Sequence, residues 1–187
     1  MKASIRRRNL QSALLEERPI AIPAELERAF RAHHGMVFRT AYRITGNAAD
    51  AEDVLQTVFL RLLRRAPGSD GLENEESYLR RAAINAALDV IRLRRAECPL
   101  ELPDLRGGPG HDDTSEIRQA LRLALAQLKP RSAEIFALRF LEGFSNPEIA
   151  RMLGLSQVLV AVIVHRTRLQ LRKTLSSYLT GRGGGKP

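Results

Sequence analysis

Apolar residues recur three and four positions apart through most of this chain, and they rarely alternate with polar residues. The three- and four-residue spacing predicts amphipathic helices that bury one face, and the lack of alternation argues against strands. Glycine and proline separate the helical stretches. The pattern predicts five helices ahead of a distinct motif near the C-terminus: residues 24–44, 49–65, 75–96, 115–127 and 131–141.

Two of these helices carry wide apolar stripes that predict their buried faces. The stripe of the second helix is Val54, Leu55, Val58, Phe59, Leu62 and Leu63. The inward residues of the third helix are Leu79, Ala83, Ala86, Val90 and Leu93. The first turn of the second helix is acidic, which suits the positive end of a helix dipole.

Segments without a period divide the chain. Residues 97–114 contain three prolines and three glycines, a composition typical of a linker. The basic stretch 1–20 and the glycine-rich end 181–187 are expected to be a loose arm and a flexible tail. We therefore predict an all-α protein with two small helical domains, 21–96 and 115–180, joined by a flexible linker.

The most informative stretch is 143–168, which reads GFSNPEIARMLGLSQVLVAVIVHRTR. Ser145 and Glu148 have the spacing of a capping box at a helix start. Gly154 allows a sharp turn, and Ser156 can cap the helix that follows. This order is typical of a helix-turn-helix, whose second helix enters the DNA major groove. An ordinary helical hairpin is the alternative that the local pattern leaves open.

The charge balance favours a polyanionic partner, because the formal net charge is +9 and the sequence pI is about 10.7. No acidic residue follows Glu148 in the sequence. The cationic residues beyond that point are Arg151, Arg166, Arg168, Arg172, Lys173, Arg182 and Lys186. Their concentration beside the helix-turn-helix favours nucleic acid as the partner.

The sequence also indicates a compartment. The single cysteine, Cys98, excludes an internal disulfide and fits a reducing environment. No apolar run approaches the ~20 residues of a membrane span, so no membrane insertion is expected. The arginines at 6–8 are not followed by the apolar segment of a secretory signal. These features predict a cytoplasmic protein.

The residue pattern does not indicate an enzyme. The histidines are scattered as His33, His34, His111 and His165, without metal-ligand spacing. The glycine-rich segment 107–110 lacks the Lys-Ser/Thr pair of a phosphate-binding loop. We therefore expect no catalytic residue, metal, cofactor or small-molecule substrate.

Each half of the chain carries an ordered set of motifs. The first half contains DAEDVLQ at 50–56, VFLRL at 58–62 and YLRRAAIN at 78–85. The second half contains LKPR at 128–131, EGFS at 142–145, EIA at 148–150 and HRTR at 165–168. In this order they resemble the two domains of bacterial sigma factors, in particular the compact extracytoplasmic-function (ECF) group. The likeness covers roughly residues 25–175.

This resemblance implies a protein with no bond chemistry of its own. Sigma factors bind core RNA polymerase, direct it to a promoter and help to open the duplex there. The implied partners are core RNA polymerase, promoter DNA and an anti-sigma factor. The implied location is the bacterial cytoplasm, at the nucleoid when the protein is bound to polymerase.

The resemblance also implies three functional surfaces. The first is the helix that begins at Asp50, which in this family docks on the polymerase. The residues that it carries over are Asp50, Asp53, Gln56, Leu60 and Arg64. The alternative is a solvated face whose charges pair along the helix, each pair contributing ~0.2–0.5 kcal/mol.

The second surface is the arginine-rich third helix, which the resemblance places at the -10 promoter element. Arginines there can neutralise phosphates and hold a separated strand. The residues assigned to this surface are Arg80, Arg81, Asn85, Arg92 and Arg95. A simple Asp89–Arg92 pair across one helical turn is an equally good interpretation of those two residues.

The third surface is the second helix of the helix-turn-helix, expected at the -35 element. The residues assigned to it are Ser156, Gln157, Ala161, Val162, His165, Arg166 and Arg168. This helix departs from the family pattern because it is apolar. The stripe predicted to be buried is Val160, Val164, Thr167 and Leu171, which leaves Leu159, Val162 and Ile163 toward the groove. Apolar side chains contact thymine methyls but cannot form bidentate hydrogen bonds to guanine, so shallow base recognition is expected.

Two other functions remain open from the sequence. One is a stand-alone helix-turn-helix regulator that binds DNA without polymerase, which does not explain the DAEDVLQ helix. The other is a degenerate sigma-like adaptor that binds protein through its apolar third helix.

Overall fold

The computed structural model describes residues 23–64, 74–97 and 113–180, and all the regular structure in these ranges is helical. The all-α fold predicted from the sequence is confirmed. The elements are α2 Ala24–Thr45, α3 Ala48–Leu63, α4 Glu75–Glu97, α5 Asp113–Ala126, α6 Pro130–Phe136, η1 Ala137–Leu141, α7 Asn146–Leu153 and α8 Gln157–Thr180. Every predicted helix is present, with ends within about three residues of the expected ones.

Some expectations lie outside the described residues. These are the arm at 1–20, most of the linker at 97–114 and the tail at 181–187. The predicted linker is slightly too long at both ends, because α4 continues to Glu97 and α5 already begins at Asp113.

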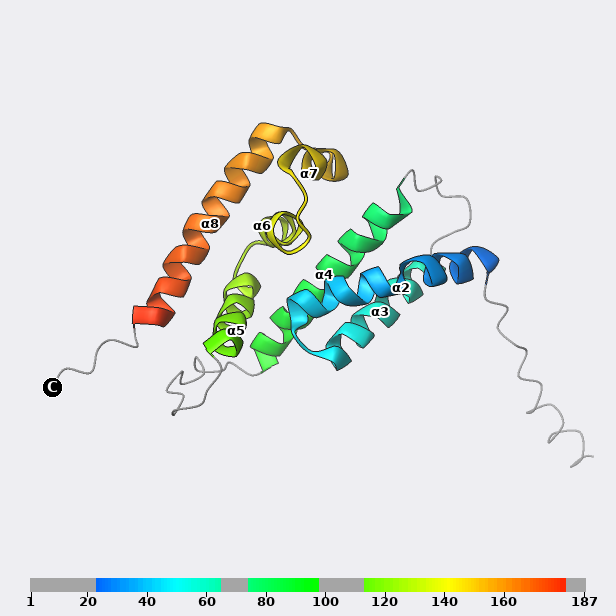
Figure 1. The fold of residues 1–187 in the computed structure, drawn as a ribbon, viewed down its shortest axis with the longest axis horizontal. Helices are drawn as coiled ribbons and strands as arrows, with labels where there is room; N and C mark the ends of the chain where they lie inside the picture. The colour runs from blue at the N-terminus through cyan, green and yellow to red at the C-terminus, as the bar shows by residue number, and fades with distance from the viewer. Residues whose placement is uncertain (1–22, 65–73, 98–112, 181–187) are drawn as a thin grey trace, which may run out of the picture.

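The first half is a three-helix unit of α2, α3 and α4 (Figure 1). Gly46 ends α2 in the left-handed conformation, with φ of 66°, and Asn47 starts α3 by accepting hydrogen bonds from the Ala49 and Asp50 N–H groups. Two residues of the predicted apolar stripes are exposed instead. Leu63 lies in the last turn of α3 and Leu93 in the last turns of α4.

The second half contains α5, α6, α7 and α8 (Figure 1). The single helix predicted at 131–141 is two elements, because α6 widens into the π-turn η1. In this turn the Glu142 N–H donates to the Ala137 carbonyl at 3.0 Å, five residues back, and the Phe144 N–H donates to the Leu138 carbonyl. Such turns are rare and often lie at functional positions.

The two halves are in contact. α4 packs against both α5 and α6, and α2 touches η1. The buried apolar residues of both halves form one continuous cluster that extends from Ala29 to Leu171 in sequence. The hydrophobic pattern predicts two domains, but it does not predict this packing of one against the other.

No single helix within 23–64, 74–97 and 113–180 is long and apolar enough to cross a membrane. Among the described helices, one pair, α7 and α8 taken together, reaches that length and composition, and the axes of the pair bend by 111° at the turn between them.

Candidate nucleic-acid and protein interfaces

The outer face of α3 presents a continuous polar and apolar stripe to solvent. Asp53, Gln56, Leu60 and Arg64 are all exposed, as the sequence predicts for a docking surface. Among the described residues none of these four side chains forms an ion pair, so the in-helix pairs of the alternative interpretation are not formed here. Leu60 is 50% exposed at the middle of the stripe, where a partner could bury it.

Asp50 does not belong to this exposed face, contrary to its assignment from the sequence. It is buried in the first turn of α3, and its Oδ1 accepts a hydrogen bond from the Arg94 guanidinium of α4. Its other oxygen, Oδ2, is buried without a partner. In this structure Asp50 therefore joins α3 to α4.

Three of the five residues assigned to the -10 side of α4 face the second half of the chain. Arg80 pairs with Glu142, just beyond η1. Arg81 Nε donates to Glu134 Oε1 of α6 at 3.0 Å, and Asn85 Nδ2 donates to the same oxygen at 3.4 Å. These three side chains are thus occupied within the molecule.

The other two residues of this set, Arg92 and Arg95, lie nearer the C-terminal end of α4. Arg92 Nη1 donates to Asp89 Oδ1 at 3.1 Å, so the pair that the sequence left open is formed. Arg95 is exposed. Within the described chain, Arg95 is the one exposed residue of the assigned surface, while Arg81 and Arg92 are partly exposed.

The start of the helix-turn-helix is held by the predicted capping box. The Ser145 N–H and hydroxyl both donate to Glu148 Oε2, at 2.7 and 2.5 Å. The hydroxyl bond, followed by the backbone bond, lowers the pKa of Glu148. Gly154 ends α7 with φ of 63°, the left-handed conformation that glycine adopts without strain. The 111° bend that follows is within the range of helix-turn-helix motifs.

The second helix of the motif, α8, is capped by Ser156, whose Oγ accepts from the Leu159 N–H at 3.2 Å. Its predicted inward stripe is confirmed, since Val160, Thr167 and Leu171 are buried and Val164 is half-buried. The seven residues assigned to the -35 side are all exposed: Ser156, Gln157, Ala161, Val162, His165, Arg166 and Arg168.

The apolar side chains on the outer face of α8 are only partly as predicted. Leu159 and Val162 are exposed, but Ile163 is half-buried against the core and does not face the groove side. Val158 is 75% exposed, and the sequence argument did not single it out. Val158 lies two residues after the cap Ser156, in the first turn of α8 beside the exposed Leu159, and this position is the signal that the sequence offered.

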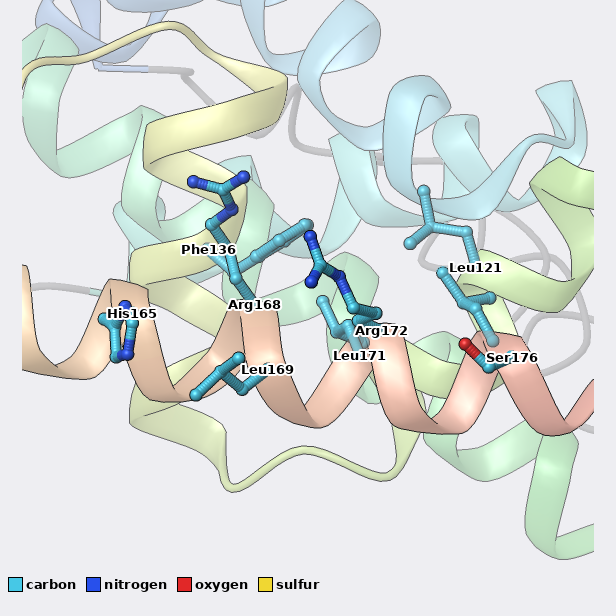
Figure 2. A pocket seen from close by; sticks show the side chains of 9 residues that line it. Leu121, Phe136, His165, Arg168, Leu169, Leu171, Arg172 and Ser176 are labelled. Carbon is cyan, nitrogen blue, oxygen red and sulfur yellow. The ribbon is translucent and has the colours of Figure 1, made fainter.

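Farther along α8 the exposed arginines border a hollow of about 550 Å³ between α5, α6 and α8 (Figure 2). Leu121, Phe136 and Leu171 form part of its apolar lining. Figure 2 shows Arg168 and Arg172 projecting from α8 on the side of Phe136. The Arg168 guanidinium carbon lies 5.9 Å from the centre of the Phe140 ring, within the range of a cation–π contact.

The described residues contain no group of three or more His, Cys, Asp or Glu side chains that could hold a metal ion. The surfaces with functional potential are therefore the α3 stripe, the arginine face of α4 and the helix-turn-helix.

Comparison with protein families matches both halves of the chain. Residues 29–97 match the Sigma-70 region 2 model, and residues 118–171 match the Sigma-70, region 4 model. The matched ranges correspond to the α2–α4 unit and to most of the α5–α8 unit.

Two curated sigma factors are similar to this chain over most of its length. The RNA polymerase sigma-E factor of Streptomyces avermitilis is 34% identical over 158 residues, which cover 82% of this chain and 86% of that protein. The ECF RNA polymerase sigma factor SigE of Mycolicibacterium smegmatis is 35% identical over 161 residues, 79% of this chain. The chain spans 60% of the length of the latter protein.

Among solved structures, CnrH in complex with the cytosolic domain of CnrY is similar at a TM-score of 0.49 and 25% identity, covering 81% of this chain and 88% of that one. The sigma factor RpoE of Bartonella quintana, solved with the anti-sigma factor NepR, is similar at a TM-score of 0.47 and 18% identity, covering 81% and 97%.

Proposed function

This chain belongs to the extracytoplasmic-function group of RNA polymerase sigma factors, and from that premise we propose how its surfaces divide the work of initiation. It binds core RNA polymerase, directs it to a promoter and helps to separate the strands there. The observation that supports this most strongly is the presence of both matched regions in one chain, with the exposed α3 stripe on the first and the helix-turn-helix on the second.

The α3 stripe is the polymerase-docking surface in this proposal. Asp53, Gln56 and Arg64 offer one negative, one neutral and one positive polar group around the exposed Leu60. A central apolar side chain within a polar rim is the usual anatomy of a protein interface. Asp50 takes no direct part, because it is buried against Arg94.

The arginine face of α4 binds the promoter near the -10 element. Arg95 is exposed for a phosphate contact, and Arg92 can exchange Asp89 for one. Arg80, Arg81 and Asn85 join this surface only when Glu134 and Glu142 release them.

The helix-turn-helix binds duplex DNA near the -35 element through α8. Gln157 offers hydrogen bonds to base edges, while His165, Arg166 and Arg168 contact phosphates. The apolar residues Val158, Leu159 and Val162 offer contacts to thymine methyls but no donors. Affinity at this site therefore comes mainly from charge.

The apolar outer face of α8 also suits a protein partner, and we propose that an anti-sigma factor covers it when the protein is held inactive. A contiguous exposed apolar patch is typical of a protein interaction site.

The factors of this family initiate transcription and are not enzymes. We place the protein in the bacterial cytoplasm, and at the nucleoid when it is part of the polymerase holoenzyme.

Capture of core RNA polymerase by the purified protein, followed by run-off transcription from a promoter selected with the resulting holoenzyme, tests the proposal. We expect capture and a discrete transcript. A stand-alone regulator would bind DNA without capturing core. An adaptor would capture core without producing a transcript, and the exposed Val158 and Leu159 are the residues that favour this second candidate.

A further inference from the structure

Two carboxylates of the second half are buried at the contact with the first half. The Glu142 side chain is 1% exposed and the Glu134 side chain is 5% exposed. Ionised carboxylates are rarely buried this far unless charged partners surround them, because leaving water costs several kcal/mol per charge. Their partners are therefore a structural requirement of the contact between the halves.

Glu142 is held by two arginines from the first half. Its Oε1 accepts from Arg43 Nη1 of α2 at 2.9 Å, and its Oε2 accepts from Arg80 of α4. Arg80 also pairs with Glu76 one turn earlier, and its guanidinium carbon lies 5.4 Å from the centre of the Phe144 ring. The π-turn η1 immediately precedes Glu142, so the widened turn sets where this carboxylate meets the first half.

Glu134 is held from both sides of the same contact. Its Oε1 accepts from Arg81 and Asn85 of α4, and its Oε2 accepts from Arg131 of its own half at 3.0 Å. Arg81 also donates to the Met152 carbonyl at 3.1 Å, next to the turn of the helix-turn-helix. Both oxygens of both glutamates thus have partners, as a buried pair requires.

The α4 residues that hold the two glutamates also belong to the proposed DNA-binding surface. Arg80, Arg81 and Asn85 are the three residues of the proposed -10 surface that the second half covers. The side chain of Arg80 is only 15% exposed. Each guanidinium gives one nitrogen to a buried carboxylate, Arg80 Nη1 to Glu142 and Arg81 Nε to Glu134, and these are donors that could otherwise bind a phosphate. The donors that hold Glu134 and Glu142 are not available to a DNA strand while the halves stay in contact.

The opposite end of the contact between the halves is rich in arginine. Arg94 and Arg95 of α4 and Arg122 of α5 line a pocket of about 310 Å³ there. Burial, followed by the neighbouring Arg118 of the same helix, lowers the pKa of Arg122. Arg94 is paired there with Asp50 of its own half, so among the described residues the ion pairs that cross between the halves are those of Glu134 and Glu142, beside the shared apolar cluster.

We propose that Glu134 and Glu142 form an intramolecular lock that holds the two halves closed and keeps the α4 arginine face from nucleic acid until the halves separate. The carboxylates take the place of DNA phosphates on Arg80, Arg81 and Asn85. The inference rests on the proposed function of α4 in binding promoter DNA. Its first consequence, closure by the two glutamates, stands independently of that function.

The test uses the full chain and the variant Glu134→Gln, Glu142→Gln. Glutamine keeps the shape and a carbonyl acceptor but removes the charge, so helicity by circular dichroism should be retained. Donor and acceptor dyes on Arg61→Cys and Arg151→Cys, both at exposed positions, report separation of the halves once Cys98→Ser removes the single native cysteine. The matched control is Glu25→Gln, Glu52→Gln, which removes the same charge from exposed positions.

We expect efficient Förster energy transfer between the two dyes in the parent and in the control Glu25→Gln, Glu52→Gln. The efficiency should be low in the variant Glu134→Gln, Glu142→Gln. Raising sodium chloride from about 0.1 M to 1 M should lower transfer in the parent but change the variant little, because salt screens the charges as they become solvated. Unchanged transfer in the glutamate variant would overturn the lock.

Binding of a fluorescein-labelled oligothymidine tests the occlusion. The glutamate variant should bind at least about tenfold more tightly than the charge-matched control, because a binding-competent state that is rarely populated weakens the apparent affinity by its fraction. Equal affinity in a variant whose halves have separated would overturn the occlusion. Arg43→Gln should give intermediate transfer and affinity, since it weakens Glu142 without altering α4 or either carboxylate.

Run-off transcription by the parent with core polymerase remains the separate test of the proposed function. A parent that initiates normally, combined with unchanged transfer in the glutamate variant, rejects the lock alone. Loss of transfer in the variant, combined with a parent that never initiates, supports closure by the glutamates and rejects the proposed function.

Discussion

Glu148 fixes the start of the helix-turn-helix by accepting two hydrogen bonds from Ser145, which lower its pKa. A carboxyl whose pKa is lowered by folding stabilises the fold above its unfolded pKa, and this contribution is lost as the pH falls through the folded value. We predict that Ser145→Ala raises the pKa of Glu148 and destabilises the protein most above the ordinary glutamate pKa. Side-chain NMR titration and denaturant unfolding at several pH values measure both effects.

Ser156→Ala is the matched control for this prediction. It removes a cap from α8 that involves no carboxylate, so it should cost about 1 kcal/mol with little dependence on pH in the acidic range. A penalty for Ser145→Ala that is equally independent of pH would show that its hydrogen bonds do not favour the ionised form of Glu148.

Single residues were predictable from the sequence where their partners are near in the chain. The capping box joins residues three positions apart, and Gly154 and Ser156 act within their own turn. Asp50 was misassigned because its partner, Arg94, is 44 residues away and the dipole argument already accounted for an acid in a first turn. Glu134 and Glu142 were likewise missed as partners of α4, since their pairing depends on how the halves pack.

At the level of the helix, α3 carries a prediction about docking. The double change Asp53→Ala, Gln56→Ala should weaken binding to core polymerase by about tenfold, or ~1.4 kcal/mol, because it removes two polar groups beside Leu60. Both side chains are exposed, so the melting temperature should change little. Fluorescence anisotropy with labelled sigma factor gives the affinity. Glu52→Ala, on the same helix but outside the stripe, should bind core normally, and normal binding by the double variant would remove α3 from the interface.

Helix positions followed from the sequence, but the limits of their buried faces did not. A stripe with helical period shows which side of a helix is apolar, but the extent of cover depends on the lengths of the neighbouring helices. Leu63 and Leu93 have the period of the apolar stripes and yet are exposed near the ends of α3 and α4. The π-turn has no strong local signal, because the run from 131 to 141 has the composition of an ordinary helix.

The apolar helix α8 carries a second prediction at this level. Arg166→Ala and Arg168→Ala should each lower by about one unit the slope of log affinity for the promoter against log salt concentration, since each removes a phosphate contact.

Single-base changes in the -35 element should cost less than the ~1–3 kcal/mol of a well-read base pair, because Leu159 and Val162 offer no donors. Competition binding by holoenzyme at fixed salt measures these penalties. Lys173→Ala, which removes an exposed cation outside the assigned set, is the charge control for the two arginine variants. Single-base penalties as large as those of a well-read base pair would mean that α8 reads bases.

In the molecule as a whole, the two halves share one apolar cluster and the paired glutamates between them. Contacts that join units across a common core make them unfold together, and calorimetry then shows one transition whose measured and van't Hoff enthalpies agree. We predict this behaviour for the parent at low salt. The variant Glu134→Gln, Glu142→Gln should show two transitions, because separated halves lose their mutual stabilisation, while Glu25→Gln, Glu52→Gln should keep one. Two transitions in the parent at low salt would mean that the halves unfold independently, and the glutamates would then contribute to local packing without coupling the domains.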